Sequence, residues 1–188
     1  MKLALIDNND SFTFNIVEII RKIPRCEFSV LPSASIKIEE LREFDKLIIS
    51  PGPGLPYEFP VLNEIIRIYY TEKPILGICL GHEAICQFFG AKLIHLPTVI
   101  HGQPKQIYIQ GHTALFQNIP KNFNVGLYHS WVVDKNEFSD ELEITGLSED
   151  GNIMAIQHKE YKIFGVQFHP ESIITEYGKE MMGNFLNV

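Results

Sequence analysis

The stretch Gly77-Ile78-Cys79-Leu80-Gly81-His82-Glu83 (GICLGHE) follows the apolar run Pro74-Ile75-Leu76 and governs the interpretation of the fold. The run predicts a buried strand, the residues from Leu80 onward predict a helix, and Cys79 stands at the junction as G-x-C-x-G. In the related pattern G-x-S-x-G, a tight strand-to-helix turn exposes a nucleophile. The helix would aim its N–H groups at the sulfur, which predicts a lowered thiol pKa. An unreactive buried cysteine is the competing interpretation, which the motif alone does not exclude.

Up to Gly90, strand-like and helix-like segments alternate along the chain. Strands are predicted over residues 3–6, 26–31, 46–49 and 75–78, and helices over 11–23, 38–42, 62–69 and 80–89, with Ser11 as the cap of the first helix. This alternation favours a parallel sheet that is covered by helices on both faces.

Beyond Gly90 the pattern changes to short β-rich runs separated by turns. The runs cover residues 92–95, 106–109, 125–128, 131–133, 142–147, 154–157 and 163–168, and a closing helix is predicted over 173–186. We interpret them as hairpins and returning strands added to the parallel core. The predicted fold class is therefore α/β, with three layers and a mostly parallel central sheet, in one domain over residues 1–188.

Composition and spacing argue against several classes of function. A net charge of −7 disfavours a nucleic-acid surface, because phosphate contacts need clustered Lys and Arg. The three cysteines suggest reduced thiols rather than a disulfide framework, and no apolar stretch approaches the roughly 20 residues of a membrane span, so we expect a cytoplasmic protein that contacts no membrane. Dinucleotide, P-loop and zinc patterns are absent, and Phe12 stands where a calcium loop needs glycine. We expect no metal and no cofactor.

A base for a nucleophilic Cys79 is suggested by the segment Gly165-Val166-Gln167-Phe168-His169-Pro170-Glu171. His169 lies where a β-run ends, which is the usual place for functional groups in open α/β sheets. If the backbone stays extended there, residues two apart point the same way and Glu171 lies beside His169. A carboxylate in that place would fix the imidazole tautomer and stabilise the imidazolium.

The loop Ser50-Pro51-Gly52-Pro53-Gly54-Leu55-Pro56 cannot continue any regular element. It follows the third predicted strand, next to the strand that delivers Cys79. Its glycines allow close approach of the backbone to a ligand, so the Gly52 N–H could complete an oxyanion hole with the Leu80 N–H. A plain connection is the alternative.

Together these parts resemble the class I (triad-type) glutamine amidotransferases over essentially the whole chain. The matching segments stand in the order of that family: SPGPGLP at 50–56, GICLGHE at 77–83, YHSW at 128–131 and FHPES at 168–172. The resemblance implies a flavodoxin-like amidotransferase fold and hydrolysis of L-glutamine through a γ-glutamyl thioester. It implies a catalytic triad of Cys79, His169 and Glu171.

The same resemblance implies roles for further residues. Gly52 and Leu80 would supply the oxyanion donors. The residues that would hold the amino-acid end of glutamine are Gly52, Gly54, Glu83, Ser130 and Trp131.

Within the family, the chain looks like the small glutaminase component of chorismate-using enzymes, either anthranilate synthase or aminodeoxychorismate synthase. The opening LALIDNNDSFTFNI is similar to the start of those subunits, and His101-Gly102 falls where they carry an HGK segment. This implies a partner, the chorismate-binding large subunit (component I), that receives the ammonia. The pattern does not choose between tryptophan and folate synthesis.

Three residues depart from the family pattern: Glu83 replaces a usual Gln, Trp131 a usual Leu, and Gln103 the lysine of HGK. We expect Glu83 to alter the affinity for glutamine and Gln103 to alter charge at the face toward the partner. Two alternatives remain open. One is another cysteine hydrolase of similar fold, such as a γ-glutamyl hydrolase, and the other is a catalytically impaired binding or regulatory homologue.

Overall fold

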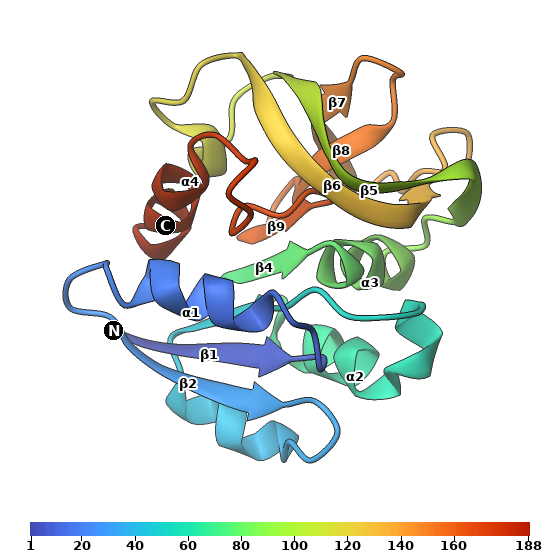
Figure 1. Ribbon diagram of the computed structural model, residues 1–188. Helices are drawn as coiled ribbons and strands as arrows, with labels where there is room; N and C mark the ends of the chain where they lie inside the picture. Colours follow the sequence, from blue (N-terminus) through green and yellow to red (C-terminus); the bar gives the residue numbers. More distant parts are fainter.

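The computed structural model describes residues 1–97 and 102–188 in full, and residues 98–101 only as backbone within one strand. His101 of the HGK-like segment therefore lies outside the residues whose side chains are described. Nine strands form one sheet in the order β2-β1-β3-β4-β9-β8-β7-β5-β6 (Figure 1). The strands are β1 (Lys2–Asp7), β2 (Glu27–Pro32), β3 (Lys46–Ile49), β4 (Ile75–Ile78), β5 (Leu93–Ile109), β6 (Asn122–Val133), β7 (Leu142–Ser148), β8 (Ile153–His158) and β9 (Ile163–Val166).

The strands β2, β1, β3, β4 and β9 run parallel to one another. Every residue of β3, β4 and β9 is buried, as expected for strands that are covered on both faces. The register pairs Ile49 of β3 with Gly77 of β4, and Ile78 of β4 with Val166 of β9. The carboxyl ends of these strands therefore meet at one edge of the sheet, next to Cys79.

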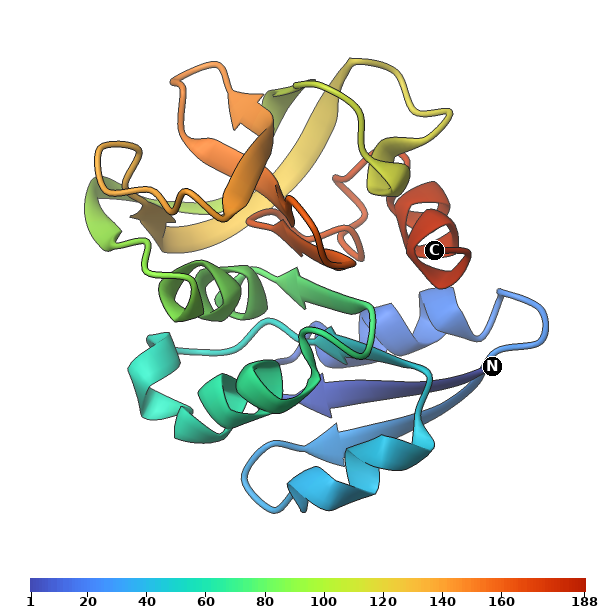
Figure 2. The same cartoon turned by 180° about the vertical axis from the view of Figure 1, so that it is seen from behind.

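Helices cover both faces of the parallel half (Figures 1 and 2). One face packs against α1 (Thr13–Ile20) and α4 (Gly178–Leu186), and the other against α2 (Pro60–Tyr69) and α3 (Leu80–Phe88). Short 3-10 helices η1 (Ile38–Glu43), η2 (Pro56–Glu58) and η3 (Ala114–Phe116) lie in the connections. The three-layer α/β fold, with a parallel core and added antiparallel strands, is confirmed.

The second half of the chain adds the antiparallel strands β8, β7, β5 and β6 to the edge formed by β9. The runs expected at 92–95 and 106–109 are the two ends of the single long strand β5, and those at 125–128 and 131–133 are parts of β6. Register shifts interrupt the β5–β6 ladder between His95 and Ile100 and between His101 and Gln103. Such bulges bend a ribbon of this length over the rest of the sheet.

Two helix starts differ from expectation. Ser11 does not cap α1; instead the Asp10 carboxylate accepts the Phe12 N–H and the Asp7 carboxylate accepts the Thr13 hydroxyl. The last helix begins at Gly178 rather than near residue 173, because residues after His169 form consecutive turns closed by the N–H groups of Ser172 and Thr175. Within the described part of the chain, no helix has the length and apolar character needed to cross a membrane.

Candidate active site

Cys79 occupies a strained turn between β4 and α3. Its backbone has φ of 50° and ψ of −103°, a region that residues with a side chain rarely adopt. The glycines on either side permit this turn. A Cβ on Gly77 would lie 2.3 Å from the carbonyl oxygen of Gly81, and a Cβ on Gly81 would lie 2.4 Å from that of Ile49. The G-x-C-x-G spacing is thus a packing requirement of the turn, and the turn presents the thiol at the end of the sheet.

Hydrogen bonds from Asn8, which follows β1, hold the loop after β3 beside the Cys79 turn. Asn8, at the end of β1, donates its side-chain N–H to the Ser50 carbonyl at 2.9 Å, and its backbone N–H donates to the Ser50 hydroxyl at 2.9 Å. A Cβ on Gly52 would lie 2.4 Å from Leu80 Cδ2 and 2.8 Å from Asn8 Cβ. Only glycine fits this gap, so the Gly52 backbone lies directly beside the first residue of α3.

His169 and Glu171 form a buried pair. The imidazole Nδ1 lies 2.6 Å from Glu171 Oε1, and the two residues are 2% and 7% exposed. The expected extended backbone is wrong, because the Ser172 N–H bonds back to the His169 carbonyl and makes Pro170 and Glu171 the centre of a turn. Proline at this place presets the turn, which brings the carboxyl group onto the imidazole. With Nδ1–H donating to Glu171, Nε2 is the nitrogen free to accept a proton.

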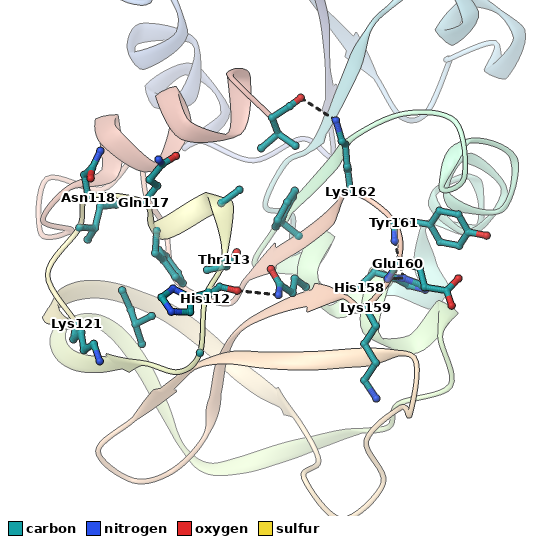
Figure 3. Close-up of a pocket in the computed structure, with 18 residues that line it drawn as sticks. His112, Thr113, Gln117, Asn118, Lys121, His158, Lys159, Glu160, Tyr161 and Lys162 are labelled. Atoms are coloured by element: carbon teal, nitrogen blue, oxygen red, sulfur yellow. Dashed lines mark hydrogen bonds between the residues drawn. The ribbon is translucent and has the colours of Figure 1, made fainter.

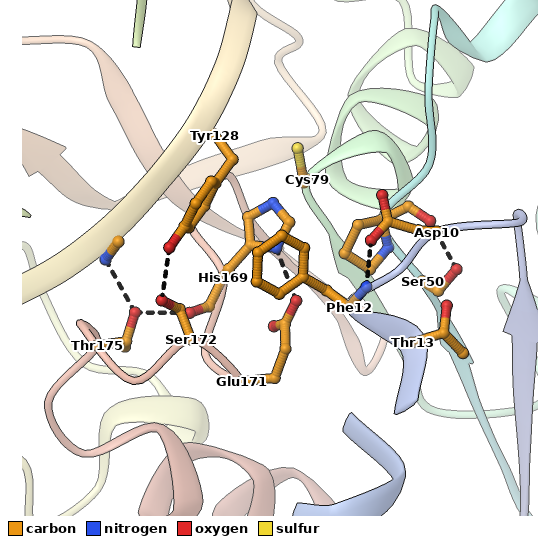
Figure 4. A network of polar contacts seen from close by, with 12 residues as sticks. Asp10, Phe12, Thr13, Ser50, Cys79, Tyr128, His169, Glu171, Ser172 and Thr175 are labelled. Atoms are coloured by element: carbon orange, nitrogen blue, oxygen red, sulfur yellow. Dashed lines mark hydrogen bonds and ion pairs between the residues drawn. The ribbon is translucent and has the colours of Figure 1, made fainter. Parts of the chain in front are cut away.

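Two aromatic rings pack against the His169 imidazole (Figure 4). Its centroid lies 4.9 Å from that of Phe12, from the loop before α1, and 4.9 Å from that of Tyr128, from β6. The Tyr128 hydroxyl is 3.0 Å from the Ser172 hydroxyl, and the His169 N–H bonds to the Gly126 carbonyl on β6. The Phe12 and Tyr128 rings also contact each other, with centroids 4.8 Å apart, so they lie side by side against the imidazole while Glu171 holds Nδ1. The imidazole Nε2 is buried and has no hydrogen-bond partner among the described residues.

Cys79 and His169 line the same small cavity, together with Asp10, Phe12 and Tyr128. Figure 4 shows the thiol next to the imidazole. The lowered thiol pKa expected from the helix terminus is not what the structure gives. Burial raises the pKa of Cys79 well above its usual value, and the nearby Glu83, Glu171 and Asp10 add to the rise, whereas the Leu80 N–H opposes it. Burial therefore favours the neutral thiol as the resting form of Cys79, in a cavity that His169 also lines.

A second cavity of about 180 Å³ also borders Cys79. It brings together every residue that the sequence suggested for the amino-acid end of a substrate. These are Gly52, Gly54, Glu83, Ser130 and Trp131, and Leu80 also lines the cavity. The volume is below the 300–1,000 Å³ typical of sites for drug-sized ligands and suits a molecule the size of an amino acid.

Sequence reasoning missed Gln167, Phe12 and Tyr128. Gln167 is fully buried; its Nε2 donates to Glu83 Oε1 at 2.9 Å and lies 3.9 Å from the Cys79 sulfur. Its position two residues before His169 was an available signal, since alternate residues at a strand end share a face. Phe12 and Tyr128 stand in segments that resemble the family, but their contacts with His169 join segments far apart in the sequence and were not predictable from it.

A larger cavity, of about 690 Å³, lies elsewhere (Figure 3). It is formed by η3, the β8–β9 turn and Val188, with His112, Lys121, Lys159 and Lys162 around it. It contains none of the predicted site residues and no cysteine. We therefore take the smaller cavities at Cys79, and not this larger one, as the candidate active site. No group of His, Cys, Asp and Glu side chains in the described residues is arranged to hold a metal ion.

Comparison with known proteins agrees with this geometry. The family model for class I glutamine amidotransferases matches residues 4–188. The chain belongs to this family.

The chain also matches individual proteins over nearly their whole length. A Haemophilus influenzae protein provisionally named anthranilate synthase component II is 43% identical over 188 residues, which cover 100% of this chain and 97% of that one. Anthranilate synthase component 2 of Cyanophora paradoxa is also 43% identical, over 98% of both chains. A crystal structure from Thermoplasma acidophilum, of a protein provisionally assigned to GMP synthase, superposes with a TM-score of 0.89 over 100% of this chain and 92% of that one. At 24% identity, that likeness shows the fold alone.

Proposed function

We propose that this amidotransferase hydrolyses L-glutamine and supplies the ammonia to a chorismate-binding component I, as the glutaminase subunit of an anthranilate synthase. Residues 1–188 would form one amidotransferase domain. The observation that carries the proposal is Cys79 on its strained turn, sharing a cavity with the His169–Glu171 pair. The names of the full-length relatives point to the component I partner. The three free cysteines fit a reducing cytoplasm.

The chemistry follows from the placement of the groups. The Cys79 sulfur attacks the side-chain amide carbon of glutamine while His169 Nε2 takes the thiol proton. The Gly52 and Leu80 N–H groups stabilise the oxyanion of the tetrahedral intermediate. His169 then gives its proton to the leaving nitrogen, and ammonia departs to leave the γ-glutamyl thioester. A water molecule, deprotonated by His169, releases glutamate and restores the thiol.

Ammonia release from glutamine tests the proposal, measured with wild-type protein and Cys79→Ser, each with and without a candidate component I. We expect release by wild type that requires Cys79 and increases with the partner. Release that survives Cys79→Ser would contradict the nucleophile, and no release by wild type with its component I would favour a binding or regulatory role. Adding chorismate should yield anthranilate; 4-amino-4-deoxychorismate would indicate folate synthesis instead.

A further inference from the structure

Glu83 is a buried carboxyl group in the proposed glutamine pocket, and no cation pairs with it among the described side chains. It is 4% exposed on the first turn of α3 and shares the pocket with Cys79, Ser130 and Trp131. None of the ion pairs between described side chains includes it. A charged carboxylate that is buried without a partner is unfavourable, and such a group binds a proton instead.

The surroundings of Glu83 offer no compensating positive charge. The titratable groups around it include the thiols of Cys79 and Cys86, His129 and Tyr128 on β6, and Glu58 on η2 behind Gly54. The neighbouring His82 is fully buried, and burial lowers its pKa to about 3, so it carries no charge near neutral pH. Burial lowers the pKa of His129 to about 4, so this imidazole is neutral near neutral pH. On their buried faces, α2 and β3 present apolar side chains. Burial accordingly raises the pKa of Glu83 to about 8, and the hydrogen bond from Gln167 partly opposes the rise.

Gln167 connects Glu83 to the nucleophile. Its side-chain nitrogen donates to Glu83 Oε1 at 2.9 Å and lies 3.9 Å from the Cys79 sulfur. Gln167 is fully buried just beyond β9, so this amide fixes where the Glu83 carboxyl group points. Glu83 and Cys79 line the pocket, and Gln167 joins them from the protein interior.

We propose that Glu83, oriented by Gln167, binds glutamine as a neutral carboxylic acid, and that loss of its proton at alkaline pH weakens substrate binding. This rests on the proposed function and adds a specificity-determining residue to it. A neutral carboxyl group has both a donor and an acceptor, as an amide side chain has, so it can hydrogen-bond the α-carboxylate of glutamine. Once ionised, it accepts only and repels that carboxylate. The new charge would also oppose ionisation of Cys79, since Glu83 raises the pKa of that thiol.

The test measures KM and kcat for glutamine between pH 6.5 and 9.5 in the complex with component I. It compares wild type with Glu83→Gln, Gln167→Leu and, as a distant control on the exposed side of α4, Glu180→Gln. Wild type and Glu180→Gln should show a KM that is about tenfold higher at pH 9 than at pH 7, because about one molecule in ten keeps the proton one unit above a pKa of about 8. In Glu83→Gln this rise should be absent. In Gln167→Leu it should begin at a higher pH, since the hydrogen bond that favours the carboxylate is lost.

The same pH dependence of KM in wild type and Glu83→Gln would overturn the proposal. If KM in Gln167→Leu begins to rise at the same pH as in wild type, Gln167 has no effect on the ionisation of Glu83. An activity-independent measurement separates this inference from the proposed function. Infrared difference spectra should show the C=O band of a protonated carboxylic acid that disappears near pH 8 and is missing in Glu83→Gln. If the band is present but no variant hydrolyses glutamine, the proposed function fails and the protonated Glu83 stands. If the band is absent from wild type at pH 7, the inference fails whatever the activity.

Discussion

Gly77 and Gly81 approach each other so closely that a methyl group on Gly77 would lie 2.3 Å from the Gly81 carbonyl oxygen. The obstacle is backbone, which cannot rotate away as a flexible side chain can. Gly77→Ala should therefore destabilise the protein by about 1–3 kcal/mol in urea unfolding and slow the reaction of Cys79. Gly183→Ala is the matched control, because nothing lies within 4 Å of a Cβ there and the site is inside α4. It should stabilise by about 0.5–1 kcal/mol, and equal losses in both variants would contradict the assignment.

Glu171→Gln should reduce kcat for glutamine hydrolysis by about 10²–10⁴ while leaving KM almost unchanged. The amide keeps the shape of the side chain but removes the charge that stabilises the imidazolium formed on His169 during attack. Steady-state ammonia release checks this, with Glu180→Gln as a carboxyl-to-amide control on an exposed helix. A kcat within a factor of two of wild type would show that Glu171 plays no part in orienting His169.

Phe12→Ala should slow attack by Cys79 without a large change in stability. The Phe12 ring packs at a steep angle against the His169 imidazole, with ring centroids 4.9 Å apart, and its loss leaves the imidazole free to turn away from the thiol. The rate of labelling by an electrophilic glutamine analogue should fall by about tenfold, in line with the loss of one positioning contact. Phe14→Ala removes an exposed ring two residues away and should label at the wild-type rate. Equal rates in the two variants would mean that Tyr128 and Glu171 suffice to hold the imidazole.

Stability should fall with acidification through His82. This residue is fully buried on α3, and burial lowers its pKa to about 3. The unfolded chain therefore binds a proton at His82 near pH 6.5, whereas the folded protein does not bind it until the pH is close to 3. The stability contributed by the neutral ring is present above pH 6.5 and is lost as pH falls toward 3. Between pH 6 and 4 the free energy of unfolding should drop by about 1.4 kcal/mol per pH unit for this group. In His82→Gln the slope of a urea-unfolding series against pH should be shallower by that amount, and an unchanged slope would show that folding does not lower the pKa of His82.

The parallel half of the fold and the Cys79 turn were predictable because their signals are local. An apolar run followed by G-x-C-x-G predicts both the strand and the helix from adjacent residues. The family comparison confirms the amidotransferase interpretation of the chain. The extents of β5 and β6 were not predictable, since β-rich runs do not reveal which distant strand pairs with them or where bulges fall.

The site shows the same division. The residues expected around a substrate do line one cavity, although their roles stay predictions. The predicted lowering of the Cys79 thiol pKa was wrong. The helix terminus that lowers the pKa is visible in the sequence, whereas the burial that outweighs it comes from β6, β9 and the loop at Gly52, which meet only in the fold. Gln167 was missed for a related reason. Its hydrogen bond to Glu83 joins residues 84 positions apart.

The positive φ of Cys79 has an evolutionary consequence. A side chain in this conformation is strained by on the order of 1–3 kcal/mol, whereas glycine adopts it freely. In a descendant that had stopped using the thiol, replacing Cys79 by glycine would relieve this strain and raise the free energy of unfolding. A cysteine in this strained place accords with the proposed use of its thiol and disfavours the alternative of a chain that only binds or regulates.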